Sequence, residues 1–422
     1  MPTQRELKNQ RIAETNRQTR LRRQSQVPLT FELGVRNEKR NRKTGCFHHL
    51  KMICVEAKWM KNMITGILNT DKEKKISNMK DKDFKSVTHY DKDGNQLVSE
   101  LKYLKSSLRL GVITEYKWNL AALSAAKKKG RKVGKIKFES EHKTVLFLQN
   151  GITHHIDVEH NVIRIQGFEY DIRVSGLKQL KNLTKQGIDY EIATLKLHMV
   201  NDTCFKFFIT VYVDRDEYNA LKEQKRQIRV QKRIKEGKTT HDTNAFDFGC
   251  KDTAVDAYGN KYNVQFGETK RLKRLQQQLA RQKRAAEKKA DQSSGGKTDS
   301  KKKPKISNSV RRYNTLQRLK KEYYNISCRK NAAAIELVNE FLDMNETVVI
   351  QDEQLTNWKK KKKVRKKNGQ EVKRRGSGRV IQHGILGRLK KRLKASPKTH
   401  VIDKWVPTTK LCTQCGKMHK NI

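Results

Sequence analysis

The sequence predicts a multidomain α+β protein. Between about residues 47 and 127, apolar residues recur at three- and four-residue steps, which predicts helices. Short β-branched and aromatic runs fill 135–214 and predict a small antiparallel β-barrel. Two later hydrophobic strands, each ending in acids, are separated by long helical stretches and predict an α/β domain. The 422 residues allow two or three modest cores.

The composition points to a nucleic-acid partner. The chain has 95 Lys and Arg against 44 Asp and Glu, a formal charge of +51, and only 35% hydrophobic residues. Such a charge attracts acidic polymers. No stretch approaches the roughly 20 apolar residues that cross a bilayer, and no apolar signal core follows the N-terminal charges, so we expect neither membrane insertion nor secretion. Seven scattered cysteines favour a reducing compartment.

The N-terminal half divides into three predicted parts. Residues 1–43 carry 12 basic and 4 acidic side chains and predict an arm that becomes ordered on nucleic acid. Two helices follow, the first through Ile53 and Met60 and the second through Trp118 and Ala125, with turn residues at 91–95 between them. The predicted barrel strands are 143–148, 153–158, 162–165 and 205–213, followed by a basic helix at 216–237.

The C-terminal half begins with a strand at 244–249 and two further short strands, which predict a meander. Helices at about 268–290 and 309–343 follow, joined by a Ser-, Gly- and Lys-rich linker. A buried strand at 347–351, a basic loop, a helix with Ile381 and Leu393 on one stripe and a final strand from His400 complete the pattern.

Two strand-end acids are the strongest functional signal. Asp247 lies between aromatic residues in the first strand of the α/β region, and Asp352 and Glu353 follow the strand at 347–351. A single strand-end acid most simply pairs with one of the many lysines, but two acids in this layout are typical of an RNase H-like fold. There, carboxylates from neighbouring strands converge on two Mg²⁺ ions, which activate a water and stabilise the leaving oxygen of a phosphodiester.

A second motif indicates zinc. Cys412 and Cys415 are separated by two residues and followed by Gly416, which is the knuckle of a zinc ribbon. The sequence ends seven residues later without a second Cys pair, and His419 is the other nearby ligand type, so the motif is a half-site. The cluster of Cys46, His48, His49 and Cys54 has no standard metal-ligand spacing and predicts ordinary core and surface positions.

Two dense basic runs lie beside these motifs. Residues 359–375 carry 11 basic side chains and one acid, and residues 270–305 carry 14 basic side chains and three acids. Such density repels itself without a polyanion, so contacts to phosphates are expected. The candidate nucleic-acid-binding residues are Lys359, Lys360, Lys361, Lys362, Lys363, Arg365, Lys366, Lys367, Arg374, Arg375, Lys301, Lys302 and Lys303.

Four motifs occur in order along the C-terminal half. They are Phe-Asp-Phe-Gly at 246–249, Gln-Asp-Glu-Gln-Leu at 351–355, Gly-Arg-Val-Ile-Gln-His at 378–383, and the segment from Asp403 to Gly416 that contains the two cysteines. In this order they resemble the transposon-encoded TnpB nucleases and the compact type V CRISPR effectors. The resemblance covers about 244–422, and the N-terminal half agrees in layout only. It implies RNA-guided DNA cleavage by a RuvC-type domain, with Mg²⁺ or Mn²⁺ at the acids and Zn²⁺ at the cysteines.

The resemblance also implies a domain map. It comprises a basic arm and the start of the wedge at 1–45, a helical recognition lobe at 46–130, a wedge β-barrel at 131–215, a linker helix at 216–243, a RuvC-like nuclease domain at 244–405 with inserted helices at 268–343, and a partial zinc ribbon at 406–422. The implied partners are a noncoding guide RNA, the double-stranded target DNA and its displaced strand.

Two departures from the family pattern affect the site. Gln351 stands where the family often has its second acid. Because side chains alternate along a strand, Glu353 returns to the face of Gln351 and is the predicted second catalytic residue, with Asp352 as the alternative. The family's second Cys pair and third catalytic Asp would follow Cys415. Either the native chain continues past Ile422 or the native protein is truncated, and a break in the middle of the ribbon favours a longer chain. Asp403 occupies the place of an Asp that is usually structural in the family.

Two other functions remain open. A family member without its third carboxylate would bind guided DNA without cutting it, as a repressor does, although a binder has no use for Asp247 and Glu353. A general RNA-binding protein would explain the charge but not the order of the motifs. In a prokaryote, the protein is expected in the cytoplasm, associated with the nucleoid; in a eukaryote, it is expected in the nucleus. Both monomers and homodimers are compatible with the family.

Overall fold

The computed structural model divides the chain into two compact units, 1–221 and 222–422, and each is considered by itself. Before residue 24, it describes only residues 4, 9, 10, 13, 14, 17 and 21. From residue 24 onward it describes the chain except 72, 91–94, 131, 135, 142, 265–268, 294–308, 353–354, 356–357, 359–361, 366–370, 375–377 and 404–422.

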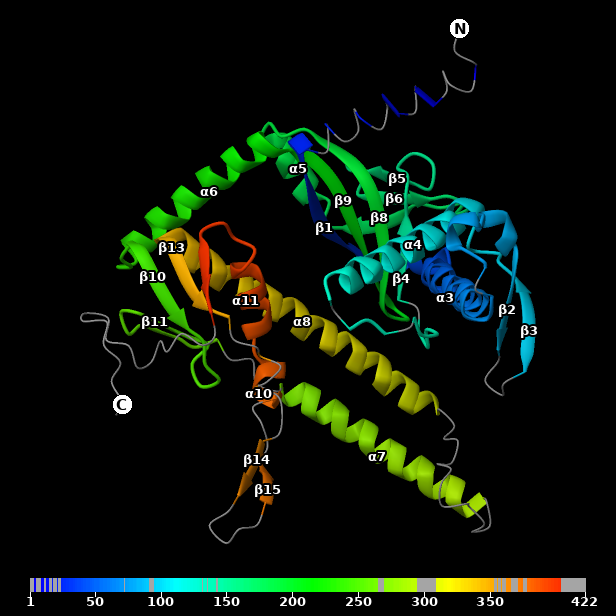
Figure 1. Ribbon diagram of the computed structural model, residues 1–422. Helices are drawn as coiled ribbons and strands as arrows, with labels where there is room; N and C mark the ends of the chain where they lie inside the picture. The colour runs from blue at the N-terminus through cyan, green and yellow to red at the C-terminus, as the bar shows by residue number, and fades with distance from the viewer. Residues whose placement is uncertain are drawn as a thin grey trace. The chain divides into compact units, whose positions relative to one another are not determined.

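The first unit contains a nearly closed, barrel-like antiparallel sheet of seven strands in the order β4-β8-β9-β1-β7-β6-β5 (Figure 1). The strands are β1 Gln26–Val35, β4 Thr144–Phe147, β5 His154–Asp157, β6 Val162–Ile165, β7 Ile172–Ser175, β8 Tyr190–Asn201 and β9 Cys204–Asp214. Every second residue of β9, from Phe205 to Val213, is buried, as expected for a strand with one face on a core. The predicted barrel strands are thereby confirmed.

Strand β1 corrects the interpretation of residues 1–43 as a basic arm. Residues 26–35 lie in the middle of the barrel sheet, where β1 pairs with β9 over nine residues and with β7 at its end. The apolar residues Val27, Leu29, Phe31 and Leu33 alternate with polar ones and contribute to the core. The high local charge concealed this alternation, because charged residues fill the segments on both sides.

Two long helices share this core with the sheet. They are α3 (Cys46–Thr70) and α4 (Ser106–Lys128), and the shorter helices of the unit are α2 (Lys39–Lys43), α5 (Lys178–Lys185), η1 (Ile76–Asn78) and η2 (Asp81–Phe84). Leu50 of α3 and Val112 of α4 are fully buried in the cluster that contains Phe207 of β9. At Gly111, a Cβ would lie 2.1 Å from the carbonyl oxygen of Leu146, so α4 can approach β4 this closely only with glycine.

The segment between α3 and α4 is not entirely helical. Strands β2 (Ser86–Tyr90) and β3 (Gln96–Glu100) form an antiparallel hairpin. Four of the five residues of the turn predicted at 91–95 lie outside the described residues, so that turn stays a prediction. The strands on either side of it were not predicted because their polar and apolar residues alternate over only five positions each.

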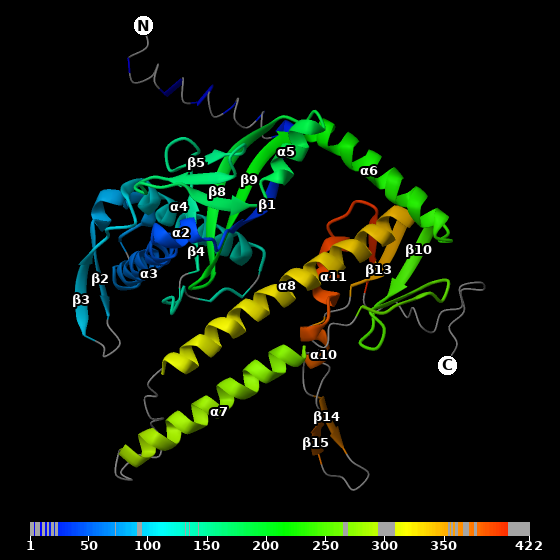
Figure 2. The same cartoon turned by 180° about the vertical axis from the view of Figure 1, so that it is seen from behind.

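The second unit contains a mixed five-stranded sheet in the order β12-β11-β10-β13-β16. The strands are β10 His241–Asp247, β11 Ala254–Asp256, β12 Lys261–Tyr262, β13 Asn345–Gln351 and β16 Thr399–Ile402. β10, β13 and β16 are parallel neighbours, and β11 and β12 form the predicted antiparallel meander. Figure 2 shows β10 and β13 side by side, with the end of α8 leading into β13.

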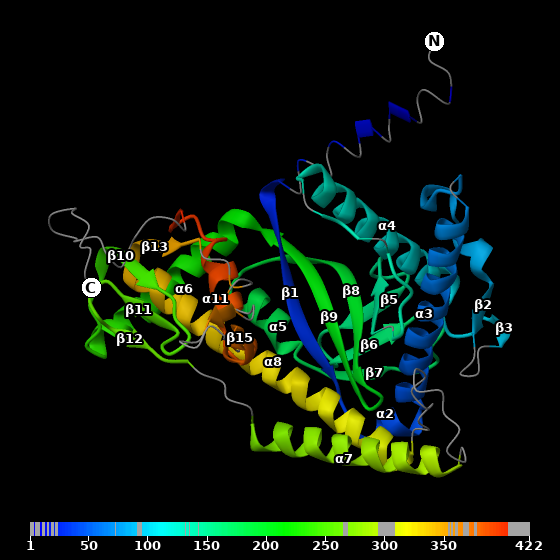
Figure 3. The same cartoon turned by 60° about the horizontal axis from the view of Figure 1, so that its bottom comes forward.

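Helices cover one face of this sheet. Phe246 of β10 and Ile350 of β13 pack with Phe341 of α8 (Val310–Met344) and Leu389 of α11 (Leu386–Leu393). α8 also lies along α7 (Lys270–Ser293), and Leu272, Leu275, Leu319 and Ile326 form the seam between them (Figure 3). Two further helices whose bounds lie within the described residues are α6 (Arg215–Lys235), which begins in the first unit, and α10 (Gly378–His383).

The basic loop predicted after β13 contains regular structure. Strands β14 (Lys362–Arg365) and β15 (Glu371–Arg374) pair as an antiparallel hairpin. Their sequences are almost entirely charged and carry no alternation that could have predicted strands. Among the described residues of the chain, no helix combines the length and apolarity of a bilayer-spanning segment.

Candidate active site

Asp247 is the last residue of β10 and lies on the face of the sheet opposite the helices. Along this strand, Asn244 and Phe246 are buried whereas Ala245 and Asp247 are exposed, as the alternation of side chains requires. The chain then turns sharply at Gly249, where a Cβ would lie 2.9 Å from the carbonyl oxygen of Asp252. The turn ends the strand just beyond the carboxylate and leaves that carboxylate at the edge of the sheet.

The parallel register brings three strand ends together at this edge. Phe246 of β10 is paired with Ile350 of β13, so Asp247 is at the level of Gln351, and Gln351 is in turn paired with Ile402 of β16. Neighbouring strands lie about 4.8 Å apart. The residues that follow β13 and β16 are Asp352 and Asp403. The carboxyl ends of all three parallel strands are therefore marked by an acid.

The carboxylate of Asp247 has no hydrogen bond or ion pair within the described residues. The simplest interpretation of a strand-end acid, a salt bridge to one of the many lysines, therefore has no support in the described part of the chain. An exposed carboxylate that has no ammonium or guanidinium partner among the described residues, in a protein with charge +51, is a candidate for binding another cation.

Asp256 shows the contrast with a structural acid of the same sheet. It is buried at the end of β11 and accepts hydrogen bonds from the backbone N–H groups of Tyr258 and Asn260, at 3.1 and 2.8 Å, and from the Asn260 side chain at 2.9 Å. Burial raises the pKa of Asp256, but these hydrogen bonds and one from Asn244 outweigh it, and the pKa is lowered overall. Asp256 holds the turn between β11 and β12.

Asp352 is engaged on the helix side of the sheet. Its carboxylate forms an ion pair with Lys394, which directly follows α11, and α11 packs on the face opposite Asp247. Its backbone N–H donates to the carbonyl of Ile402 at 2.9 Å, so the chain still follows β16 at this point. Lys394 was not anticipated from the sequence because it lies 42 residues away. Glu353, the predicted second catalytic residue, lies outside the described residues.

Only some of the predicted metal ligands lie among the residues that the structure describes. Among the residues that the structure describes, no group of three or more His, Cys, Asp and Glu side chains is arranged to hold a metal. Cys412 and Cys415 lie outside those residues. Cys46 and Cys54 are fully buried in the core of the first unit, and burial raises the pKa of each thiol to about 12. They are packing residues, as their spacing predicted.

The predicted phosphate-contacting side chains also remain predictions. Lys362, Lys363 and Arg365 lie in β14 and Arg374 in β15, where only the backbone is described. The positions that lie wholly outside the described residues are Lys301, Lys302, Lys303, Lys359, Lys360, Lys361, Lys366, Lys367 and Arg375.

Comparison with known protein-family models and with curated proteins finds no match for this sequence.

Proposed function

We propose that the protein is an RNA-guided DNA endonuclease with RuvC-type chemistry, as its resemblance to the TnpB nucleases implies. The observation that carries the proposal is the position of Asp247. This exposed carboxylate, without a cationic partner in the described residues, ends a strand beside the parallel strand that leads into Asp352 and Glu353. A first acid on a central strand and a second on its parallel neighbour are the arrangement that a two-metal phosphodiesterase needs.

The topology of the sheet supports the same proposal. A three-stranded meander, β10 to β12, is followed by parallel strands that add on the other side of β10, which makes the strand of Asp247 the centre of the sheet. This is the layout expected of an RNase H-like domain. In sheets with parallel strands, ligand sites form outside the carboxyl ends of the strands, where Asp247 lies.

The chemistry of the available donors fits Mg²⁺ or Mn²⁺. These ions prefer carboxylate oxygens and keep open positions for water and phosphate, and Asp247 has both of its oxygens unengaged within the described chain. Asp247 and Glu353 would hold the ions, which when bound supply water activation and stabilisation of the leaving oxygen. Asp352 is already paired with Lys394, which favours Glu353 as the second ligand.

The proposal assigns the remaining motifs to binding. The basic residues at 301–303 and 359–375 would neutralise phosphates of the guide RNA, of the target DNA and of its displaced strand. Such contacts position nucleic acid without reading its sequence. Cys412 and Cys415 would provide half of a zinc site, which needs two more ligands.

The test is cleavage by the complex of protein and guide RNA. The protein would be produced together with the DNA that flanks its gene, purified with its RNA, and given Mg²⁺ and plasmids that carry the guide complement beside randomised sequence. We expect Asp247→Ala to reduce cleavage by several orders of magnitude while guide RNA and guided DNA binding persist, because base pairing and backbone contacts carry recognition. Glu353→Gln should have the same effect, and Asp352→Asn a far milder one.

Asp242→Asn is the matched control. Asp242 is an exposed acid near the amino end of the same strand, so its replacement removes the same charge from β10 but not from the carboxyl edge. Cleavage should survive in this variant. If the unaltered complex binds its guided target and cuts nothing with either Mg²⁺ or Mn²⁺, the protein is a guided binder and the proposal is wrong.

A further inference from the structure

An arginine-lined pocket lies on the first unit, at one end of the barrel-like sheet. The pocket has a volume of about 470 Å³, and its charged lining consists of four arginines, two aspartates and one histidine: Arg36, Arg40, Arg164, Arg173, Asp157, Asp171 and His160. These residues come from the end of β1, from α2, from β5 to β7 and from the connections between them. With His160 neutral, the lining has a net charge of +2.

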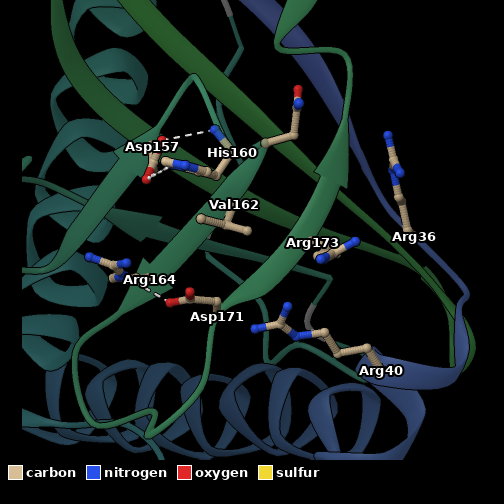
Figure 4. A pocket seen from close by; sticks show the side chains of 9 residues that line it. Arg36, Arg40, Asp157, His160, Val162, Arg164, Asp171 and Arg173 are labelled. Atoms are coloured by element: carbon tan, nitrogen blue, oxygen red, sulfur yellow. Dashed lines mark hydrogen bonds and ion pairs between the residues drawn. The ribbon is translucent and has the colours of Figure 1, made fainter.

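The acids of the pocket are already paired, and two of the arginines are not. Asp171 accepts a hydrogen bond from Nε of Arg164 at 2.8 Å. The carboxylate of Asp157 forms a hydrogen bond with Nδ1 of His160, also at 2.8 Å. Within the described residues, neither Arg36 nor Arg40 has a side-chain partner, and both are exposed. Figure 4 shows Arg36, Arg40 and Arg173 on one side of the pocket and Arg164 on the other.

A buried asparagine holds three of these arginines in place. Asn41 is fully buried, and its side-chain NH₂ donates to the backbone carbonyls of Arg36 at 2.8 Å and Arg173 at 3.0 Å. Its side-chain oxygen accepts from the backbone N–H of Arg173 at 3.2 Å. Asn41 also follows Arg40 directly in α2. One buried amide therefore links β1, α2 and β7, and fixes the backbone from which the three guanidinium groups extend.

The arrangement is that of a built anion site. Like charges held together without anions repel each other, and here a buried polar side chain maintains their proximity. The guanidinium group is planar and presents paired N–H donors that match the oxygens of a phosphate group. Arg173 forms only a long ion pair, because its Nε lies 3.6 Å from Oε1 of Glu38, and its side chain is 44% exposed.

We propose that this pocket, which we call the arginine pocket, binds backbone phosphates of a nucleic-acid strand. A phosphate group on a polymer is favoured over a small anion because Arg36 and Arg40 are exposed and the pocket belongs to a chain of charge +51. The proposal stands on the geometry of the first unit and does not require that Asp247 be catalytic.

The test compares two arginines of the same short helix. Arg40 lines the pocket, whereas Arg42, two residues later and also exposed, does not. The Nε of Arg42 donates to the side chain of Asn37 at 2.8 Å. Arg40→Gln and Arg42→Gln remove the same charge. Binding of fluorescent single-stranded RNA, single-stranded DNA and duplex DNA to the full-length protein would be measured by anisotropy across a range of salt concentrations.

We expect Arg40→Gln, and Arg36→Gln with it, to weaken binding of at least one of these probes about tenfold, as the loss of a charge-assisted hydrogen bond does. The magnitude of the log–log salt slope should decrease by about 0.7 unit for a single strand, or about 0.9 unit for duplex DNA, for each arginine removed. Arg42→Gln should change the affinity less than twofold. The probe that loses most affinity identifies the strand that occupies the pocket.

Three results would overturn the proposal. The first is an equal loss for Arg40→Gln and Arg42→Gln, which would mean that only overall charge matters. The second is unchanged binding of all three probes while inorganic phosphate still protects Arg40 from phenylglyoxal, which would make this a site for a small anion. The third is stronger displacement of RNA and DNA from the pocket by poly-glutamate than by an unlabelled strand of equal charge, which would indicate an acidic protein partner. Absence of DNA cleavage has no bearing on any of them.

Discussion

His154 illustrates how the environment of one residue sets a property that the sequence does not show. It lies in β5, is only 2% exposed, and its Nδ1 is 2.9 Å from the hydroxyl of Thr153. Its Nε2 is buried and has no hydrogen-bond partner among the residues that the structure describes. Burial lowers the pKa of His154 to about 4, and the neighbouring charge of His155 contributes in the same direction. The imidazole is therefore neutral in the folded protein.

The first unit should lose stability in weak acid because of His154. Its pKa is about 6.5 in the unfolded chain and about 4 in the folded one, so between these values the unfolded state binds more protons. The free energy of unfolding should be unaffected above pH 6.5 and should fall by about 1.4 kcal/mol per pH unit below it. The total loss of stability should be about 3 kcal/mol near pH 4. Urea unfolding of the first unit, measured from pH 7.5 to 4.5, checks this.

The contribution of His154 to the pH dependence can be separated from that of other groups by comparing variants of His154 and of its neighbour His155. His154→Gln should be less stable than the unaltered protein at pH 7 but should show a flatter dependence on pH between 6.5 and 4.5. His155→Gln, which changes an exposed side chain of the same strand, should keep the steep dependence. Equal pH profiles for all three proteins would show that other groups cause the loss of stability.

Between elements, the best-defined contact is the one that joins α6 to the end of α8. Asp343 is almost fully buried and accepts two hydrogen bonds from Arg229, at 2.7 and 3.0 Å, and one from Arg233 at 2.6 Å. The paired bonds from Arg229 have the geometry of a fork on a carboxylate. Because Asp343 precedes β13 by two residues, this contact also fixes the start of the strand that runs beside β10.

Replacement of Asp343 by alanine should destabilise the second unit by about 3 kcal/mol. Removing one partner of a buried ion pair leaves an uncompensated charge, and the loss should lie at the low end of the usual range because Arg229 retains contact with water. Glu340→Gln, three residues earlier on the same helix, breaks the more exposed pair with Lys238 and should cost about 1 kcal/mol or less. Urea unfolding that shows equal losses for the two variants would contradict this assignment.

The elements also show what sequence patterns could and could not predict. Helices α7 and α8 and the meander from β10 to β12 were predicted close to their observed bounds, because leucines at helical spacing and short β-branched runs are local signals. Strand β1 and the hairpin of β14 and β15 were not predicted, because their pairing partners lie far away or their residues are mostly charged. Pairing across long sequence separations has no local signature.

The two candidate sites differ in the same way. Asp247 could be predicted as a candidate because it ends a recognisable strand within a motif. The parallel pairing of β10 with β13 then places it beside the strand that leads into Asp352. The arginine pocket was not predicted, because its arginines are separated by up to 137 residues and only Arg40 lies in a basic run, at Lys39–Lys43. Only the fold of the first unit, held by Asn41, brings them together.

For the whole molecule, the dominant property is a charge of +51 distributed over both units. A protein of this charge binds RNA largely by releasing the cations condensed on the phosphates. The number of phosphates neutralised can be read from the dependence of affinity on salt, with a log–log slope of about −0.7 per phosphate for a single strand. This slope therefore measures how much of the charge is a binding surface.

The affinity of the full-length protein for its guide RNA should fall steeply with salt, with a log–log slope of several units in magnitude. Replacing the five lysines at 359–363 by glutamine should reduce that magnitude by up to about 3.5 units if each contacts a phosphate. The variant should also weaken binding of all RNA sequences alike, because phosphate contacts carry no sequence information. Filter binding between 50 and 500 mM KCl, roughly one decade of salt, covers the needed range.

A slope near one for the unaltered protein would show that most of its charge faces solvent rather than nucleic acid. A lysine variant with an unchanged slope would place the contacts elsewhere, and the arginine pocket of the first unit would be the next surface to test.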